Sequence, residues 1–98
     1  MNSLEQNMLQ IKSLDKDASL CFSEYTHNWY VLANIEKGGG GVLSGIVEHE
    51  STPEGAVDSY FHHLTTVDLD HYLVVKSYDN KARRHYRWNG AAFAEIPR

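Results

Sequence analysis

Six histidines are the residues of this chain best suited to metal binding or to proton transfer near neutral pH. Their spacing forms no metal motif, because the sequence has neither an HExxH pattern nor a cluster of Cys and His. His62 and His63 are adjacent, so on a helix their side chains would point about 100° apart. A composite site built from Glu48, His49 and His71 is an open alternative. The simpler interpretation is surface or hydrogen-bonded imidazoles, with no metal and no other cofactor.

The carboxylates and the single cysteine give little support to catalysis. Glu48 and Glu50 have the spacing of neighbours on one strand face, and so do Asp68 and Asp70. Solvated carboxylates in loops are nevertheless commoner than catalytic pairs. Cys21 would need a nearby cation or base to act as a nucleophile, and we expect a small buried apolar side chain instead. The sequence therefore predicts a protein that is not an enzyme.

Four consecutive glycines, Gly38 to Gly41, raise the question of a phosphate-binding loop, since such loops expose backbone N–H groups to anions. Phosphate loops precede a helix and carry GxxxxGK[ST] or GxGxxG. Here the strand-like run Val42 to Val47 follows the glycines. We interpret them as the loop of a β-hairpin.

Charge is distributed unevenly along the chain. Residues 1–75 carry three Lys/Arg and eleven Asp/Glu, whereas residues 76–98 carry six Lys/Arg and two Asp/Glu. The net charge of −4 argues against adhesion of the whole surface to nucleic acid or to an anionic membrane. Any phosphate binding must therefore be local.

Acidic residues gather around the predicted second helix, where they could meet a basic surface of another protein. The candidate partner-binding residues are Glu48, Glu50, Glu54, Asp58, Asp68 and Asp70. The alternative surface is the basic C-terminal ribbon, in which cations alternate with aromatic rings as in proteins that bind single-stranded nucleic acid. Its candidate residues are Lys81, Arg83, Arg84 and Arg87.

Two helices are expected to position these groups. Apolar residues at helical intervals follow Ser3, predicting a helix over about residues 3 to 14. Thr52-Pro53-Glu54 is a strong start signal for a second helix over about 53 to 65, because threonine caps and proline needs no N–H donor there. Gly55 is expected to weaken this helix.

Strands are predicted for the remaining apolar runs, at Leu20 to Phe22, Trp29 to Ile35, Val42 to Val47, Tyr72 to Tyr78, Arg83 to Trp88 and Ala91 to Ile96. Asn89-Gly90 predicts a two-residue hairpin turn. That turn would pair Trp88 with Ala91, Tyr86 with Phe93 and Arg84 with Glu95. It would also place Tyr86 and Trp88 on the core side of the sheet.

Together these elements predict one α+β domain over residues 1–98, with an antiparallel sheet of about five strands packed against two helices. An edge strand after the C-terminal hairpin could pair with a second copy of the chain and form a homodimer. The N-terminal residues have neither a basic start nor an unbroken apolar run. We therefore expect a cytoplasmic protein without a membrane partner.

The segment from Trp29 to Leu64, with its two strands, Gly-rich turn and Ser51-Thr52-Pro53-Glu54 helix start, resembles the core of HicB-type antitoxins. The small acidic α+β build and the ending from Tyr86 to Phe93 resemble accessory proteins of phages and prophages, including anti-CRISPR proteins. These resemblances imply a protein that binds and neutralises a host protein inside a bacterial cell.

The sequence thus favours a non-enzymatic, phage-type inhibitor that binds a host nucleic-acid-processing protein through acidic side chains. The alternative is a small RNA- or DNA-binding, antitoxin-like regulator that uses the basic C-terminal hairpin.

Overall fold

The structure is a computed structural model that describes residues 3–39, 42–45, 49–66, 72–76 and 83–96. Within these residues it contains helices α1 (Ser3–Leu14) and α2 (Pro53–Thr65). The strands are β1 (Ser19–Ser23), β2 (Asn28–Leu32), β3 (Ile35–Gly39), β4 (Val42–Gly45), β5 (Tyr72–Lys76), β6 (Arg83–Trp88) and β7 (Phe93–Glu95). The α+β class and the bounds of both helices agree with the sequence-based prediction.

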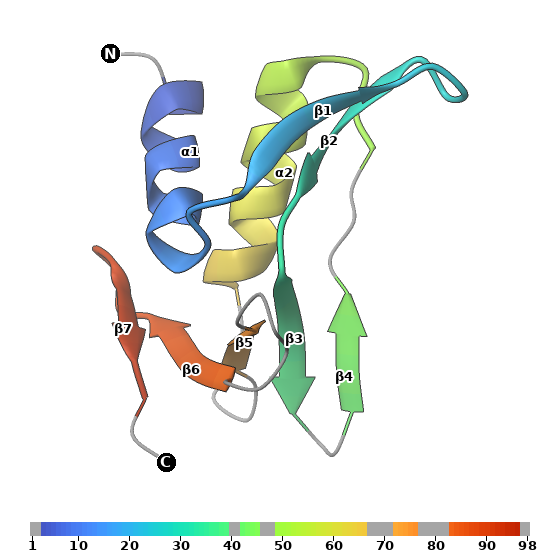
Figure 1. The fold of residues 1–98 in the computed structure, drawn as a ribbon. Helices are drawn as coiled ribbons and strands as arrows, with labels where there is room; N and C mark the ends of the chain where they lie inside the picture. Colours follow the sequence, from blue (N-terminus) through green and yellow to red (C-terminus); the bar gives the residue numbers. More distant parts are fainter. Residues whose placement is uncertain (1–2, 40–41, 46–48, 67–71, 77–82, 97–98) are drawn as a thin grey trace.

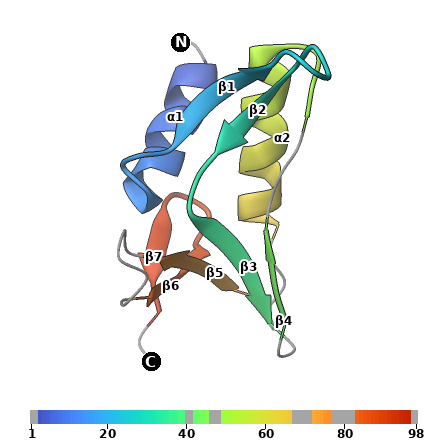
Figure 2. The same cartoon turned by 45° about the vertical axis from the view of Figure 1, so that its right-hand side comes forward.

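Both helices lie side by side, and the β1–β2 hairpin crosses the upper half of α2 (Figure 1). The sheet formed by strands β3 to β7 lies beyond the C-terminal ends of both helices, as Figure 2 shows from a second direction. Apolar side chains from all three layers meet in one core, in which Ile11, Val31, Tyr60, Leu64 and Leu73 are fully buried. Burial of this apolar surface is the main force holding the layers together.

The prediction of a single sheet was wrong. The described strands form two antiparallel sheets, a two-stranded sheet β1-β2 and a five-stranded sheet with the order β4-β3-β5-β6-β7. The predicted strand from Trp29 to Ile35 is divided between them, into β2 and β3. Two of the predicted loop glycines, Gly38 and Gly39, belong to β3, where they pair with Leu43 and Val42.

The division between β2 and β3 has a specific cause in Asp15. This carboxylate is buried and accepts a hydrogen bond from the backbone N–H of Asn34 at 2.8 Å. Its other oxygen accepts from the N–H of Asp17 at 3.0 Å. Because the Asn34 N–H bonds to a side chain, it is withdrawn from the strand ladder. The end of α1 is thereby tied to the corner where the chain passes from one sheet to the other.

The C-terminal hairpin forms, but with a register different from the predicted one. Trp88 pairs with Phe93 and Tyr86 with Glu95, so four residues rather than two form the loop. The Asn89 side-chain oxygen causes this, because it accepts hydrogen bonds from the N–H groups of Ala91 and Ala92, both at 2.9 Å. Gly90 has a φ of +99°, which suits glycine.

This register differs from the predicted one by two residues, so the same side chains still face the core. Phe61 on α2 contacts the Trp88 ring edge-on with a centroid distance of 5.3 Å. The predicted ion pair also forms, with Arg84 Nε 3.8 Å from Glu95 Oε1, although the two residues are not directly opposite each other.

Gly55 lies where the segment before α2 passes close to the first turn of that helix. A Cβ atom at this position would be 2.9 Å from Thr52 Oγ1, the N-cap oxygen that accepts the Gly55 N–H at 3.0 Å. Gly55→Ala normally favours a helix by up to about 1 kcal/mol. Here it should displace the cap, and we expect the free energy of unfolding to fall by about 1 kcal/mol.

Urea denaturation of a double-mutant cycle checks this expectation. With Thr52→Ala already present, the close contact is gone, and adding Gly55→Ala should be neutral or stabilising. Equal losses in both backgrounds would show that the N-cap contact is not the cause.

Candidate functional site

The end of the β1–β2 hairpin carries a cluster of aromatic side chains. Phe22 and Trp29 are direct partners across the two strands, and their rings meet edge-on with centroids 5.2 Å apart. His27 approaches Phe22 at 6.4 Å. Tyr25 lies in the connecting turn and is 99% exposed, while Phe22 is 46% exposed. We call Phe22, Tyr25, His27 and Trp29 the aromatic tip.

The exposure of the tip follows from the length of the hairpin. Leu20 and Val31 are also paired and lie on the same strand face as Phe22 and Trp29. They pack into the core, whereas the hairpin continues past the first turn of α2 (Figure 1). The aromatic residues nearest the turn therefore do not pack into the core and stay exposed. Monomeric proteins seldom expose such clusters without a binding role.

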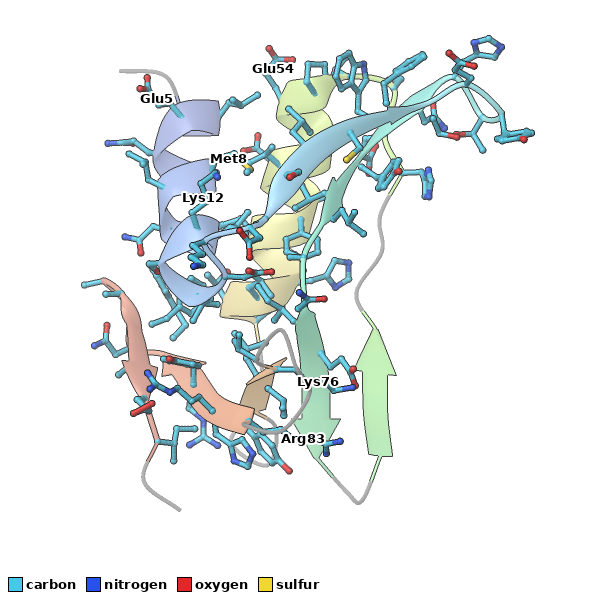
Figure 3. The ribbon with its side chains drawn as sticks, in the orientation of Figure 1. Glu5, Met8, Lys12, Glu54, Lys76 and Arg83 are labelled. Atoms are coloured by element: carbon cyan, nitrogen blue, oxygen red, sulfur yellow. The ribbon has the colours of Figure 1, made fainter. Side chains whose placement is uncertain are left out.

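Glu50 and Glu54 lie beside the aromatic tip. Glu50 forms an isolated bridge with Trp29, through backbone hydrogen bonds of 2.7 and 2.9 Å. Its side chain reaches the first turn of α2, since a Cβ atom at Gly55 would lie 3.4 Å from Glu50 Cβ. Glu54 is exposed in that same turn, and Figure 3 shows it at the same end of the molecule as Glu5.

Asp58, one turn further along α2, is directed elsewhere. Its carboxylate accepts a hydrogen bond from Asn7 Nδ2 at 2.9 Å, which links α2 to α1. Of the six predicted acidic residues, the structure thus brings Glu50 and Glu54 to the tip and uses Asp58 between the helices. Glu48, Asp68 and Asp70 lie outside the described residues.

The predicted basic residues are divided between two faces of the longer sheet. Arg84 lies on the same face as Tyr86 and is held by Glu95. Arg83 and Arg87 alternate with it and therefore lie on the opposite face. His85 lies on that opposite face too, stacked on Tyr72 with ring centroids 4.6 Å apart. Lys81 lies outside the described residues.

The histidines and the cysteine do not come together as a metal-binding group in the part of the chain that the structure describes. No group of three or more His, Cys, Asp or Glu residues in that part could hold a metal ion. His49 stacks on Tyr30 at 5.1 Å, while Glu48 and His71 of the composite alternative lie outside the described residues. Cys21 is half-buried, with Sγ 4.0 Å from the Ser19 carbonyl oxygen.

Tyr60 is a buried titratable group, and its surroundings make it chemically inert. Its hydroxyl has no hydrogen-bond partner among the described residues. Burial, and secondly the negative charge of Asp15, raise the pKa of Tyr60 far above its ordinary value. The phenol therefore stays protonated at physiological pH and cannot serve as a base.

Sequence reasoning missed the aromatic tip. The sequence predicts a strand that begins at Trp29, but it does not predict that this strand would carry exposed aromatic residues at its end. The polar run Glu24 to His27 was the available signal, since it separates two apolar strands by the length of a hairpin turn. It did not indicate that the hairpin would extend beyond the helices.

Within the described residues, no helix is both long and apolar enough to cross a membrane. Comparisons with protein families, with curated proteins and with solved structures found no match to this chain. The resemblances to HicB-type antitoxins and to anti-CRISPR proteins therefore stay predictions.

Proposed function

We propose that the protein is a non-enzymatic binding domain that docks on a basic surface of another protein through the aromatic tip and its neighbouring carboxylates. The observation that carries this proposal is the exposure of Phe22 and Tyr25 on the hairpin whose Trp29 is bridged to Glu50, with Glu54 exposed in the adjoining first turn of α2. An exposed apolar surface and carboxylates are therefore neighbours at this end of the molecule.

Aromatic side chains are strong anchors in protein interfaces because each can bury about 150–250 Å² while few bonds lose rotational freedom. Phe22 is held edge-on against Trp29, and Trp29 is fixed by its backbone bonds to Glu50. Phe22 is therefore ordered before binding, which lowers the entropic cost of association.

The acidic residues determine which partner fits. Carboxylates beside an apolar anchor favour a partner with a complementary basic surface, and they speed its approach at low salt. Proteins that bind nucleic acid present such surfaces. Occupation of that surface would block nucleic acid, so the protein would act as an inhibitor of a host nucleic-acid-processing protein, in the manner of small phage proteins.

A nucleic-acid-binding regulator is the second candidate, and one observation favours it. Arg83 and Arg87 share a sheet face with the stacked rings of Tyr72 and His85, which combines cations for phosphate with rings for bases. It ranks second because Arg84 lies on the other face, which leaves fewer cations together.

Affinity capture with matched variants tests the proposal. Phe22→Ala with Tyr25→Ala removes the anchors. Leu9→Ala removes an apolar side chain on α1 whose 63% exposure lies between those of Phe22 and Tyr25. We expect wild type and Leu9→Ala to retain the same basic host protein in low salt. The double variant should bind it at least about tenfold more weakly, as loss of hot-spot residues typically causes.

Glu54→Gln should weaken capture less and reduce its dependence on salt. Retention of the same protein by wild type and the double variant would contradict the proposal. Retention of nucleic acid alone, lost with Arg83→Gln, would replace it by the second candidate.

A further inference from the structure

A groove of about 410 Å³ lies between the C-terminal end of α1 and strands β5 and β6. Its lining includes three cationic side chains that face it: Lys12 and Lys16 from the acidic N-terminal part of the chain, and Arg84 from the basic C-terminal part. Lys76 also borders the groove, but it pairs with Arg83 across the strands, so its side chain lies on the opposite sheet face from Arg84. We call Lys12, Lys16, Arg84 and the space between them the basic groove.

The carboxylates that contact the basic groove leave part of its charge available. Lys76 is paired with Glu36 at 2.5 Å on the opposite sheet face, so neither charge belongs to the groove. Arg84 is 3.8 Å from Glu95, with 72% and 53% of the two side chains exposed. An ion pair this exposed stabilises little, so Arg84 can turn to another anion at small cost. Lys12 donates to a neutral acceptor, the Lys16 carbonyl oxygen, at 3.3 Å.

The helix dipole accounts for only part of this arrangement. Lys12 lies in the last turn of α1, where a cation is stabilised by the negative end of the helix. That effect fades within one turn and gives no reason for Arg84 to approach the same place from the sheet. Cations that share a groove repel one another, and a bound anion would relieve the repulsion.

We propose that the basic groove binds a small phosphorylated ligand of the nucleotide or polyphosphate class. Its volume falls within the usual range of about 300–1,000 Å³ for ligand sites. Arg84 supplies a planar guanidinium suited to phosphate, and the lysines supply point charges. Tyr86 lines the same groove and offers an aromatic surface to a base or a sugar.

The overall charge of the protein favours a small ligand over a nucleic-acid strand. At a net charge of −4, a long polyanion is repelled by most of the surface that it crosses. A small ligand meets chiefly the local cations, because salt screens charges more than about 8 Å away. This site and the aromatic tip are separate proposals, carried by different residues.

Calorimetric titration with ATP and with inorganic tripolyphosphate tests this assignment, and the two arms distinguish a nucleotide from bare polyphosphate. We expect saturable binding of at least one of them in low salt. Lys12→Gln and Arg84→Gln should each weaken it about tenfold, as loss of a charge-assisted contact does. Both residues are exposed, so the variants should fold, and thermal unfolding checks this.

Arg83→Gln is the matched control, because it removes an exposed cation next to Arg84 on the opposite sheet face. It should leave the affinity within about twofold of wild type, because its side chain points away from the groove on the other face of the sheet. The absence of saturable binding by both probes would overturn the assignment. So would an equal loss with Arg83→Gln, or tighter binding of a single-stranded oligonucleotide than of ATP.

Discussion

Asp15→Ala is expected to lower the free energy of unfolding by about 3 kcal/mol, because two hydrogen bonds to a charged acceptor are lost at once. The N–H groups of Asn34 and Asp17 bond to this carboxylate at 2.8 and 3.0 Å. The Asn34 N–H lies at the corner between the two sheets. With no acceptor there, it must either stay unsatisfied or open the corner to water.

Asp17→Ala is the control for this prediction. This variant removes a carboxylate at an exposed position two residues after Asp15. The free energy of unfolding should change by no more than about 0.5 kcal/mol. Urea denaturation of both variants at neutral pH measures the difference. If Asp15→Ala costs no more than Asp17→Ala, Asp15 is not the residue that holds the corner.

Tyr60→Phe is expected to raise the free energy of unfolding by about 1 kcal/mol at neutral pH, a reversal of the usual effect of core substitutions. The Tyr60 hydroxyl is fully buried and has no hydrogen-bond partner among the described residues. Phenylalanine keeps the ring that packs in the core and removes the group whose desolvation is uncompensated.

The same variant should also change how the free energy of unfolding depends on pH above pH 10. Burial, and then the charge of Asp15, raise the pKa of Tyr60 far above its ordinary value of 10.0. Below pH 10 the phenol is neutral in both states, and its contribution to stability is fully present. As pH rises further, the unfolded chain ionises first, and stability falls by up to about 1.4 kcal/mol per pH unit.

Tyr60→Phe should not lose stability in this way, because phenylalanine does not ionise. The difference in the free energy of unfolding between variant and wild type should therefore widen from pH 9 to pH 12. Denaturation at a series of pH values measures this difference. A difference that stays constant over this range would mean that the folded protein ionises Tyr60 as readily as the unfolded chain does.

Local sequence signals sufficed for the helices. Thr52-Pro53-Glu54 starts α2 through a cap oxygen, a residue without an N–H and an acidic first turn, all within three residues. The C-terminal ion pair between Arg84 and Glu95 was also predictable, because it needs only the alternation of two neighbouring strands.

Features that depend on distant residues could not be predicted. The run from Trp29 to Ile35 reads as one strand, and only Asp15, nineteen residues before Asn34, divides it. Asn89-Gly90 favours a two-residue turn, but the Asn89 side chain bonds to two backbone N–H groups and makes the loop longer. Such competition between side chain and backbone is decided by geometry that a sequence pattern does not contain.

The uneven distribution of charge along the sequence is arranged differently in the folded structure. Along the sequence it separates an acidic part from a basic end. In the fold, Lys12 and Lys16 from the acidic part join Arg84 from the basic end in the basic groove. Glu54 and Glu5 lie at the other end of the helices (Figure 3). Opposite charges therefore gather at opposite ends of the helices, which a charge count along the sequence does not reveal.

Site-specific photo-crosslinking tests the central claim, docking through the aromatic tip, most directly. A benzophenone side chain placed at Tyr25 would report what contacts the tip in host lysate, and the same group placed at Leu9 would report contacts of an exposed site on α1. The proposed function predicts one basic host protein crosslinked from Tyr25, weakened by salt, and absent from Leu9. Crosslinking of that protein from Leu9 alone, or no crosslinked protein from Tyr25, would contradict it.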